Sequence, residues 1–403
     1  MTPAAADTAT GAAQVAVAVL LNAACILPSF MVAAAAGEMG RDFPLGPVAI
    51  GIAFSAYWLV ASVSAFPLAS LLRHRSAAAA LRVAGTAAAA GSVLVVLVSH
   101  SALALCLALA LVGLTPALAT PAVNVVIMGR VPIRRRAFAF AVASASPVTA
   151  LAVAGSAGHA LAVELGWRTA YLLAGAAALV LVACVRGTGR RARTEVDRTD
   201  RVPPRGRARL GPLAVMMTGV LGGNLAVGAA TAFLVVAAPA GGVDVATAAV
   251  GVSAGAAGSV LFRILLAVLV DRRGIDPFPL CGAMLTLGAV GFVLLAVPAP
   301  WSFVTGLVLV LVPGWSWVSL LVHGVMSRYP DDVAQASGVV QIGYFIGGVI
   351  GPVAFGALAG ATSFGAAWSV MAAAHLVAAT SVLVGARRLP AFRGARVGDA
   401  VMR

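Results

Sequence analysis

The sequence predicts an all-α membrane protein with twelve transmembrane helices in two six-helix, pseudo-symmetric halves. The first observation is composition: 61% of the 403 residues are hydrophobic and 10% are charged, whereas soluble domains are about 45–50% apolar and 25% charged. The second is a mean hydropathy of +1.03. The third is that apolar stretches of about 18 or more residues recur along the chain, each long enough to cross a hydrocarbon core of about 30 Å as a helix.

The apolar stretches place the helices in chain order, with each boundary good to about two to four residues. An even number of helices puts both termini on the same side of the membrane. We expect spans at roughly residues 13–36, 48–72, 77–98, 102–128, 137–160, 168–185, 212–238, 247–270, 278–297, 302–326, 336–359 and 366–385.

All 27 basic residues are arginine. In a soluble protein the formal charge of +14 would raise the question of nucleic acid. Most arginines instead stand in short runs at alternate ends of the apolar stretches, such as Arg134 to Arg136 and Arg272 with Arg273. This is the positive-inside pattern. We therefore expect a multi-pass protein of the cytoplasmic membrane with both termini in the cytoplasm, and no nucleic-acid partner.

The two halves resemble each other when they are offset by about 200 residues, as a parallel repeat would leave in sequence. The matched landmarks are Asn22 and Ser29 with Asn224 and Thr231, Met128 to Arg130 with Met326 to Arg328, and Trp167 with Trp368. The longest polar segment, which is rich in arginine and holds Pro203 and Pro204, separates the halves. We expect an N-terminal half at 1–189, a basic cytoplasmic linker at 190–210, a C-terminal half at 211–389 and a cytoplasmic tail at 390–403.

The segment from Ala267 to Gly274, AVLVDRRG, resembles the G-x-L-x-D-R-x-G loop of the major facilitator superfamily. The resemblance runs over nearly the whole chain and implies a transporter that works by alternating access. It also implies a switching loop made of Asp271, Arg272, Arg273 and Gly274. The corresponding N-terminal segment has Ser70 in place of the aspartate, which departs from a two-sided latch.

Two further stretches are similar to the cyanate-transporter-like members of that superfamily. They are residues 121–136 with Gly166 to Arg168, and residues 338–352, GVVQIGYFIGGVIGP. The second stretch contains Gly343, Gly347 and Gly351 on one helix face, closed by Pro352, which predicts close helix packing. Pro147 is expected to break the fifth span.

Polar residues at helical spacing are the candidate binding residues, because spans one, four, seven and ten line the central cavity in the resembled fold. A structural alternative is that Asn, Ser and Thr simply form hydrogen bonds between helices. The predicted cavity residues are Asn22, Asn124, Asn224, Thr231, Arg263, Trp315, Ser319, His323, Gln341 and Tyr344.

Arg263 is the basic residue placed well inside a span, where a charge costs at least about 2.5 kcal/mol. All 13 acidic residues map to loops, termini or span ends. The side chain can extend toward Asp271 or bond backbone carbonyls, or it can meet an anionic part of a substrate. For proton coupling the mid-span candidates are His323, His159 and His375, of which His323 beside the tryptophans of the tenth span is preferred.

The sequence therefore predicts a secondary transporter for a small solute, favoured as anionic by Arg263. One alternative is a proton-coupled exporter of amphipathic compounds, and another is a non-transporting membrane sensor or structural protein. No HExxH or Walker pattern indicates an enzyme. The four cysteines lie far apart, so we expect no metal and no cofactor. The expected partners are the substrate, the lipid bilayer and protons as a candidate coupling ion, with the protein acting as a monomer.

Overall fold

The structure is a computed structural model that describes residues 3–72, 76–131, 139–140, 142–185, 210–328 and 333–389. Within these residues it contains 12 helices that are long and apolar enough to cross a membrane, and no strand. Each overlaps one predicted span, which confirms the all-α membrane fold. The predicted linker at 190–210 lies almost entirely outside the described residues, and the tail at 390–403 lies outside them altogether.

The chain forms two compact units. The first comprises Met1–Asp197, Thr231–Val236 and Val245–Ser253, and the second comprises Arg198–Ala230, Ala237–Asp244 and Ala254–Arg403. The helices of the N-terminal half are α1 (Pro3–Ala34), α2 (Ala36–Asp42), α3 (Pro47–Leu72), α4 (Ala77–Val98), α5 (Ala102–Val112), α6 (Leu114–Arg130), α8 (Ser146–Val153), the π-helical turn η1 (Ala154–Gly158), α9 (His159–Leu165) and α10 (Trp167–Cys184).

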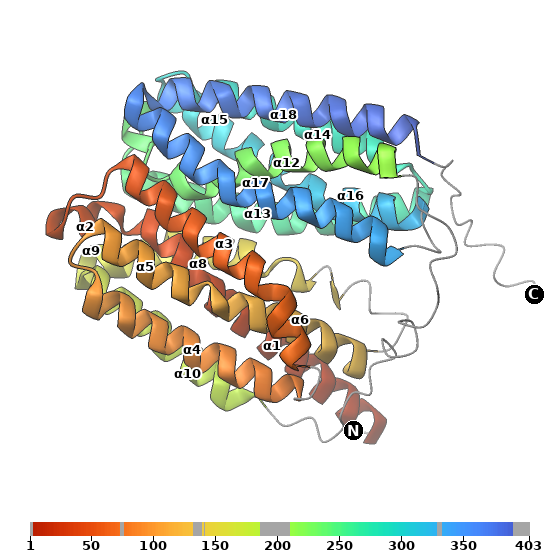
Figure 1. Ribbon diagram of the computed structural model, residues 1–403, viewed down its shortest axis with the longest axis horizontal. Helices are drawn as coiled ribbons and strands as arrows, with labels where there is room; N and C mark the ends of the chain where they lie inside the picture. Colours follow the sequence, from red (N-terminus) through yellow and green to blue (C-terminus); the bar gives the residue numbers. More distant parts are fainter. Residues whose placement is uncertain are drawn as a thin grey trace, which may run out of the picture. The chain divides into compact units, whose positions relative to one another are not determined.

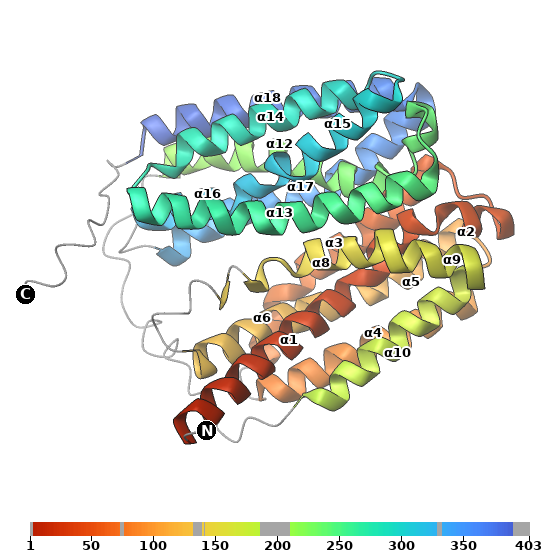
Figure 2. The ribbon, with the colours of Figure 1, turned by 180° about the vertical axis from the view of Figure 1, so that it is seen from behind.

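The C-terminal half repeats the same order of long helices. These helices are α12 (Leu210–Phe233), the 3₁₀ turn η2 (Ala238–Gly241), α13 (Val245–Arg273), α14 (Pro277–Leu295), α15 (Pro300–Leu311), α16 (Pro313–Arg328), α17 (Val333–Ala361) and α18 (Phe364–Arg387). In the N-terminal half α4 lies beside α10, and in the C-terminal half α14 lies beside α18 (Figure 1, Figure 2). Equivalent helices therefore pair in both halves.

Helix ends follow the local sequence. The hydroxyls of Ser76, Ser101 and Ser363 accept hydrogen bonds from the backbone three residues later, which caps α4, α5 and α18. At the other end of a helix, Gly274 follows α13 with φ of +59°, a conformation that glycine adopts without strain.

The fourth and tenth spans are each divided into two helices, and the two interruptions lie about 200 positions apart. In the first, α5 ends before Gly113, where an added Cβ would lie 2.3 Å from the Tyr57 carbonyl oxygen. In the second, α15 ends before Val312 and α16 begins at Pro313, which has no N–H to continue the ladder. The break is thus part of the repeat, although its cause differs between the copies.

The fifth span differs from its predicted bounds. It was expected at roughly residues 137–160, whereas the long apolar helix runs over Ser146–Leu165. Pro147 lies in the first turn of α8, and Ser144 and Ala145 before it form a turn. The break predicted at Pro147 is therefore present. The continuous span therefore starts at Ser146 rather than near residue 137, because proline favours the first turn of a helix.

The ends of α2 and α10 are joined by a polar contact within the first unit. Asp42 accepts a hydrogen bond of 2.8 Å from Trp167 Nε1 and forms an ion pair with Arg168. The Arg168 guanidinium also lies 4.4 Å from the centre of the Trp167 ring. These hydrogen bonds, first from Trp167 and then from Arg168, lower the pKa of Asp42 below its usual range.

We expect this contact to lose its stabilising effect in acid. The pKa of Asp42 is lower in the folded protein than in the unfolded chain, where it is about 3.9. The ionised carboxylate therefore stabilises the folded state fully above this value, and the stabilisation is lost as the pH falls toward the folded-state pKa. Thermal unfolding of the wild type and Asp42→Asn should therefore differ by a constant amount from pH 7 to 5. The difference should shrink below about pH 4. A difference that grows in acid would contradict this assignment.

Candidate functional site

The main polar cluster inside the second unit is built around Arg263 of α13. Its Nη2 donates to the Trp315 carbonyl oxygen at 2.9 Å, and its Nε donates to Ser316 Oγ at 3.4 Å. The guanidinium carbon lies 5.5 Å from the centre of the Trp315 ring. The side chain therefore reaches the first turn of α16, just after the break in the tenth span.

Neighbouring serines fix the position of this contact. Ser316 Oγ donates to the Val312 carbonyl oxygen at 2.5 Å and lies 3.1 Å from Ser259 Oγ. Ser259 and Ser316 are both almost completely buried. The Ser316 hydroxyl thus bonds the carbonyl one turn back along the chain, as serines in helices commonly do. Arg263 is thereby held against α16 by two neutral groups and one aromatic face.

The positive charge of Arg263 meets neutral groups among the described residues. The ion pairs found in the described part of the chain join Arg41 with Glu38, Arg168 with Asp42 and Arg328 with Asp276. The side chain of Asp271, the predicted partner in one interpretation, lies outside the described residues. The hydrogen bond from Arg263 to a backbone carbonyl, the other contact expected from the sequence, is present. No described carboxylate neutralises the positive charge of Arg263.

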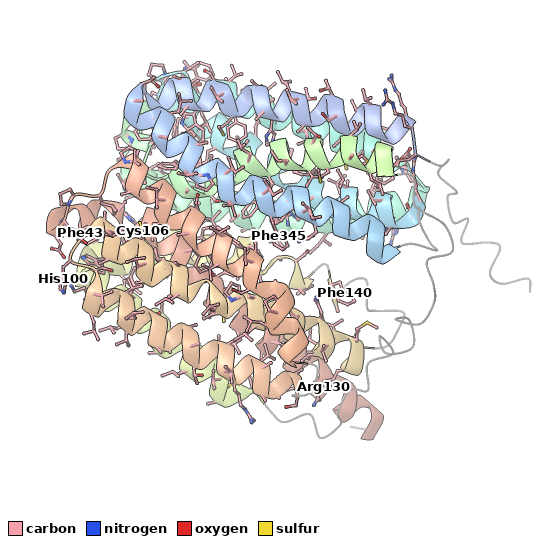
Figure 3. All side chains as sticks on the ribbon, viewed as in Figure 1. Phe43, His100, Cys106, Arg130, Phe140 and Phe345 are labelled. Carbon is pink, nitrogen blue, oxygen red and sulfur yellow. The ribbon has the colours of Figure 1, made fainter. Side chains whose placement is uncertain are left out.

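Asn224 and Tyr344 complete the cluster from two further helices. Asn224 of α12 is 5% exposed, and its Nδ2 donates to the Tyr344 carbonyl oxygen at 2.6 Å. The Tyr344 hydroxyl lies within electrostatic reach of the Arg263 guanidinium. The Tyr344 ring meets Phe345, which is labelled in Figure 3, edge to face at 6.2 Å. Tyr344 of α17 therefore interacts both with Asn224 of α12 and with the charge of Arg263.

The remaining predicted residues of the second half lie around this cluster without joining it. Ser319 Oγ donates to the Ser316 carbonyl oxygen at 3.0 Å, one turn further along α16. His323 and Gln341 have exposed side chains. No described contact connects either of them to Arg263. Thr231, at the end of α12, is 8% exposed and belongs to the first unit.

In the first unit the predicted polar residues form a smaller, uncharged contact. Thr120 of α6 donates to Asn22 Oδ1 of α1 at 3.2 Å. Asn22 is buried, whereas Asn124, one turn beyond Thr120, is exposed. Ser29 is buried and donates to the Ile26 carbonyl oxygen of its own helix at 2.8 Å. The matched residues Asn22 and Asn224 thus have different partners in the two halves.

Sequence reasoning missed a second polar node in the first unit, at the Cys25 carbonyl. It accepts hydrogen bonds from Tyr57 Oη at 2.9 Å and from Thr115 Oγ1 at 3.2 Å. Both donors lie beside the interruption of the fourth span at Gly113. A tyrosine in the middle of an apolar stretch is the signal that could have revealed it, since a buried phenol needs an acceptor.

Sequence reasoning also missed the partner of Arg328, at the end of α16. This side chain is 6% exposed and pairs with Asp276 Oδ2 at 2.5 Å. It also donates to the Ala386 carbonyl oxygen at 3.2 Å and lies 4.8 Å from the centre of the Phe278 ring. Asp276 Oδ1 in turn accepts from the Phe278 N–H and caps α14. Asp276 directly before Pro277 was the available signal, because that pair is typical of a helix start.

The predicted switching loop spans the end of α13. Arg272 and Arg273 are exposed in its last turn, and Gly274 ends the helix. The latching role assigned to Asp271 stays a prediction because its side chain is not described.

The predicted packing glycines of α17 lie against the backbone of α12. A Cβ added at Gly343, Gly347 or Gly351 would lie 2.5, 2.3 or 2.0 Å from the carbonyl oxygens of Met217, Leu221 and Leu225, respectively. Pro352 of α17 lies against Gly228 of α12. A Cβ added at Gly228 would lie 3.3 Å from the Cδ atom of Pro352. Such close approach brings the α17 backbone to the Asn224 side chain.

The 12 long apolar helices of the described residues are those of a polytopic membrane protein. The sequence pattern of the Major Facilitator Superfamily matches residues 18–352, and the chain belongs to this family. No curated protein sequence matches the chain. The resemblance to cyanate-transporter-like members is not confirmed.

Solved transporters share the fold at low sequence identity. A bacterial homolog of the human lysosomal transporter Spinster, in an inward-facing and unoccupied conformation, is 15% identical with a TM-score of 0.72, covering 94% of this chain and 97% of that one. The nucleoside transporter NupG is 14% identical with a TM-score of 0.65, covering 93% and 98%. These likenesses establish the fold.

Proposed function

We propose that this protein is a secondary transporter that carries a small anionic solute across the cytoplasmic membrane by alternating access. The carrying observation is Arg263, a cation inside a membrane span whose described partners are a carbonyl, a hydroxyl and an aromatic ring. A charge in this position is costly and marks a functional site by default. An anionic cargo supplies the missing negative charge.

The surroundings of Arg263 fit a binding role. The guanidinium retains donors beyond those used by Trp315 and Ser316, and a carboxylate can accept two of them side by side. Asn224 and Tyr344 add polar groups from α12 and α17. Family membership and the transporter neighbours support transport as the activity, whereas the anion preference depends on this cluster.

A thermal-unfolding screen of the purified protein tests the anion preference. Benzoate, formate and cyanate should raise the melting temperature between pH 5 and 8, whereas the neutral analogue benzyl alcohol should not. Ligand at 100 times its Kd stabilises a protein by about 2.7 kcal/mol, which is easily measured. Stabilisation by benzyl alcohol equal to that by benzoate would reject an anion site.

A second candidate is a proton-coupled exporter of amphipathic compounds. The observation that favours it is the exposed side chain of His323 on α16, the helix that also presents Trp315. A histidine side chain can take up and release a proton during a transport cycle. Under this function, hydrophobic drugs rather than small anions stabilise the protein in the same screen.

A further inference from the structure

We infer that the cargo carries a single negative charge and that one net negative charge crosses the membrane in each transport cycle, so that an inside-negative potential drives the cargo outward. The inference rests on the proposed anion site and adds its charge stoichiometry, energy source and direction. It follows from the charges placed in and around the cluster at Arg263.

The first step is the charge that the described side chains give the empty site, which is +1. The other described arginines of the second unit lie at helix ends: Arg328 pairs with Asp276, and Arg387 and Arg388 end α18. Arg272 is nine residues beyond Arg263, about 14 Å along α13 at a rise of 1.5 Å per residue, and it is exposed. A monoanion therefore neutralises the site, whereas a dianion leaves one buried negative charge without a described cation.

The second step concerns the shape of the cargo. Nε and one N–H of Nη2 are used by Ser316 and Trp315, which leaves three N–H donors of the guanidinium without a described partner. These donors form a planar edge that suits the paired oxygens of a carboxylate or sulfonate. The Trp315 ring lies against the same guanidinium, so an aromatic or other flat apolar body fits beside the head group.

The third step concerns compensating protons. Of the 13 acidic residues, only Glu164 falls within one of the twelve described spans, next to the last residue of Ser146–Leu165. His159 Nδ1 lies 2.8 Å from the Ala34 carbonyl oxygen, and His375 Nε2 lies 3.3 Å from that of Gly314, deep in the core. No carboxylate, the group that commonly carries protons in such transporters, therefore lies in the middle of a described span. His323, the proton carrier of the alternative function, has no described contact with Arg263, so the charge of the loaded site is set by Arg263 and the cargo.

The consequence is a direct response to voltage. Moving one elementary charge across 100 mV changes its free energy by about 2.3 kcal/mol, and 1.4 kcal/mol corresponds to a factor of ten. A monoanion moved alone should therefore reach a concentration ratio of roughly tenfold for each 60 mV. It accumulates on the positive side, which is the outside of a respiring cell.

The experiment uses proteoliposomes in which valinomycin and potassium gradients set the potential, with equal pH on both sides. The probes are radiolabelled benzenesulfonate and benzoate, of which benzenesulfonate remains a monoanion at every pH used. We expect roughly tenfold accumulation of benzenesulfonate on the positive side for 60 mV. An imposed pH gradient at zero potential should produce none. Arg263→Gln should abolish this accumulation, and Arg82→Gln, on α4 of the first unit, should preserve it.

The possible contrary results separate the inference from the proposed function. Arg263-dependent flux of benzenesulfonate that follows a pH gradient and ignores voltage overturns the inference and leaves anion transport standing. Accumulation of benzene-1,3-disulfonate by roughly a hundredfold for 60 mV shows two charges per cycle and also overturns it. If benzenesulfonate does not move, or if its flux is unchanged in Arg263→Gln, both the inference and the proposed function are rejected.

Discussion

Arg263→Gln is expected to weaken binding of a monoanion by roughly 30-fold to several thousand-fold, corresponding to about 2–5 kcal/mol for the loss of one partner of a buried charge pair. Glutamine keeps an N–H donor at about the position of the Arg263 Nε, which faces Ser316 Oγ, but removes the positive charge. The protein should still fold and insert, because removing a charge from within a span also removes its desolvation cost. Equilibrium binding of labelled benzoate to purified protein measures the effect.

Two variants sharpen this test. Arg263→Lys keeps the charge but loses the planar fork, so its affinity should lie between those of the wild type and Arg263→Gln. Arg82→Gln is the matched control, because the Arg82 guanidinium also donates to a backbone carbonyl, that of Val185, at 2.7 Å. Unchanged benzoate affinity in Arg263→Gln, or an equal loss in Arg82→Gln, would contradict the assigned role.

The sequence singled out Arg263, and Trp315, Asn224 and Tyr344 with it, but not the contacts that these residues make. A single arginine within an apolar span is easily recognised, because the hydropathy pattern alone shows that a charge lies inside the membrane. Its partners depend on the break between α15 and α16, which brings Trp315 and Ser316 to that depth. The position of such a break depends on where a proline interrupts the hydrogen bonding of the helix and on how the following helix packs. Hydropathy alone does not record either property.

The repeat was likewise visible in sequence, although its details were not. Asn22 and Asn224 occupy matched positions, yet Asn22 accepts from Thr120 and Asn224 donates to the Tyr344 backbone. The difference arises because the glycines of α17 bring its backbone close to α12. A repeat in sequence therefore predicts which positions correspond, whereas side-chain size on the facing helix decides their partners.

Polar contacts between distant helix ends were the least predictable feature. Arg328 and Asp276 stand at the ends of two spans, where charges are common and most face solvent. Nothing in the local pattern distinguishes a nearly buried arginine from an exposed one. Their pairing becomes apparent only when α14, α16 and α18 are assembled around the Phe278 ring.

The largest stability loss is expected for Gly351→Ala. The new Cβ would lie 2.0 Å from the Leu225 carbonyl oxygen, far inside van der Waals contact, and the obstacle is backbone rather than a movable side chain. Helix α17 must therefore move away from α12. Overpacking of this kind costs about 1–3 kcal/mol and occasionally more, which should appear as a clear fall in the melting temperature of the purified protein.

This loss should extend to the candidate site. The Asn224 to Tyr344 hydrogen bond of 2.6 Å crosses the same α12 and α17 contact, so a displacement of an ångström or more should break it. We therefore expect Gly351→Ala to weaken benzoate binding as well as stability.

Gly129→Ala on α6 is the control, because an added Cβ there meets no atom within 4 Å. There, replacing glycine in a helix should be neutral or stabilising by up to about 1 kcal/mol. Equal melting temperatures for the Gly351→Ala and wild-type proteins would show that the two helices do not pack through this glycine face.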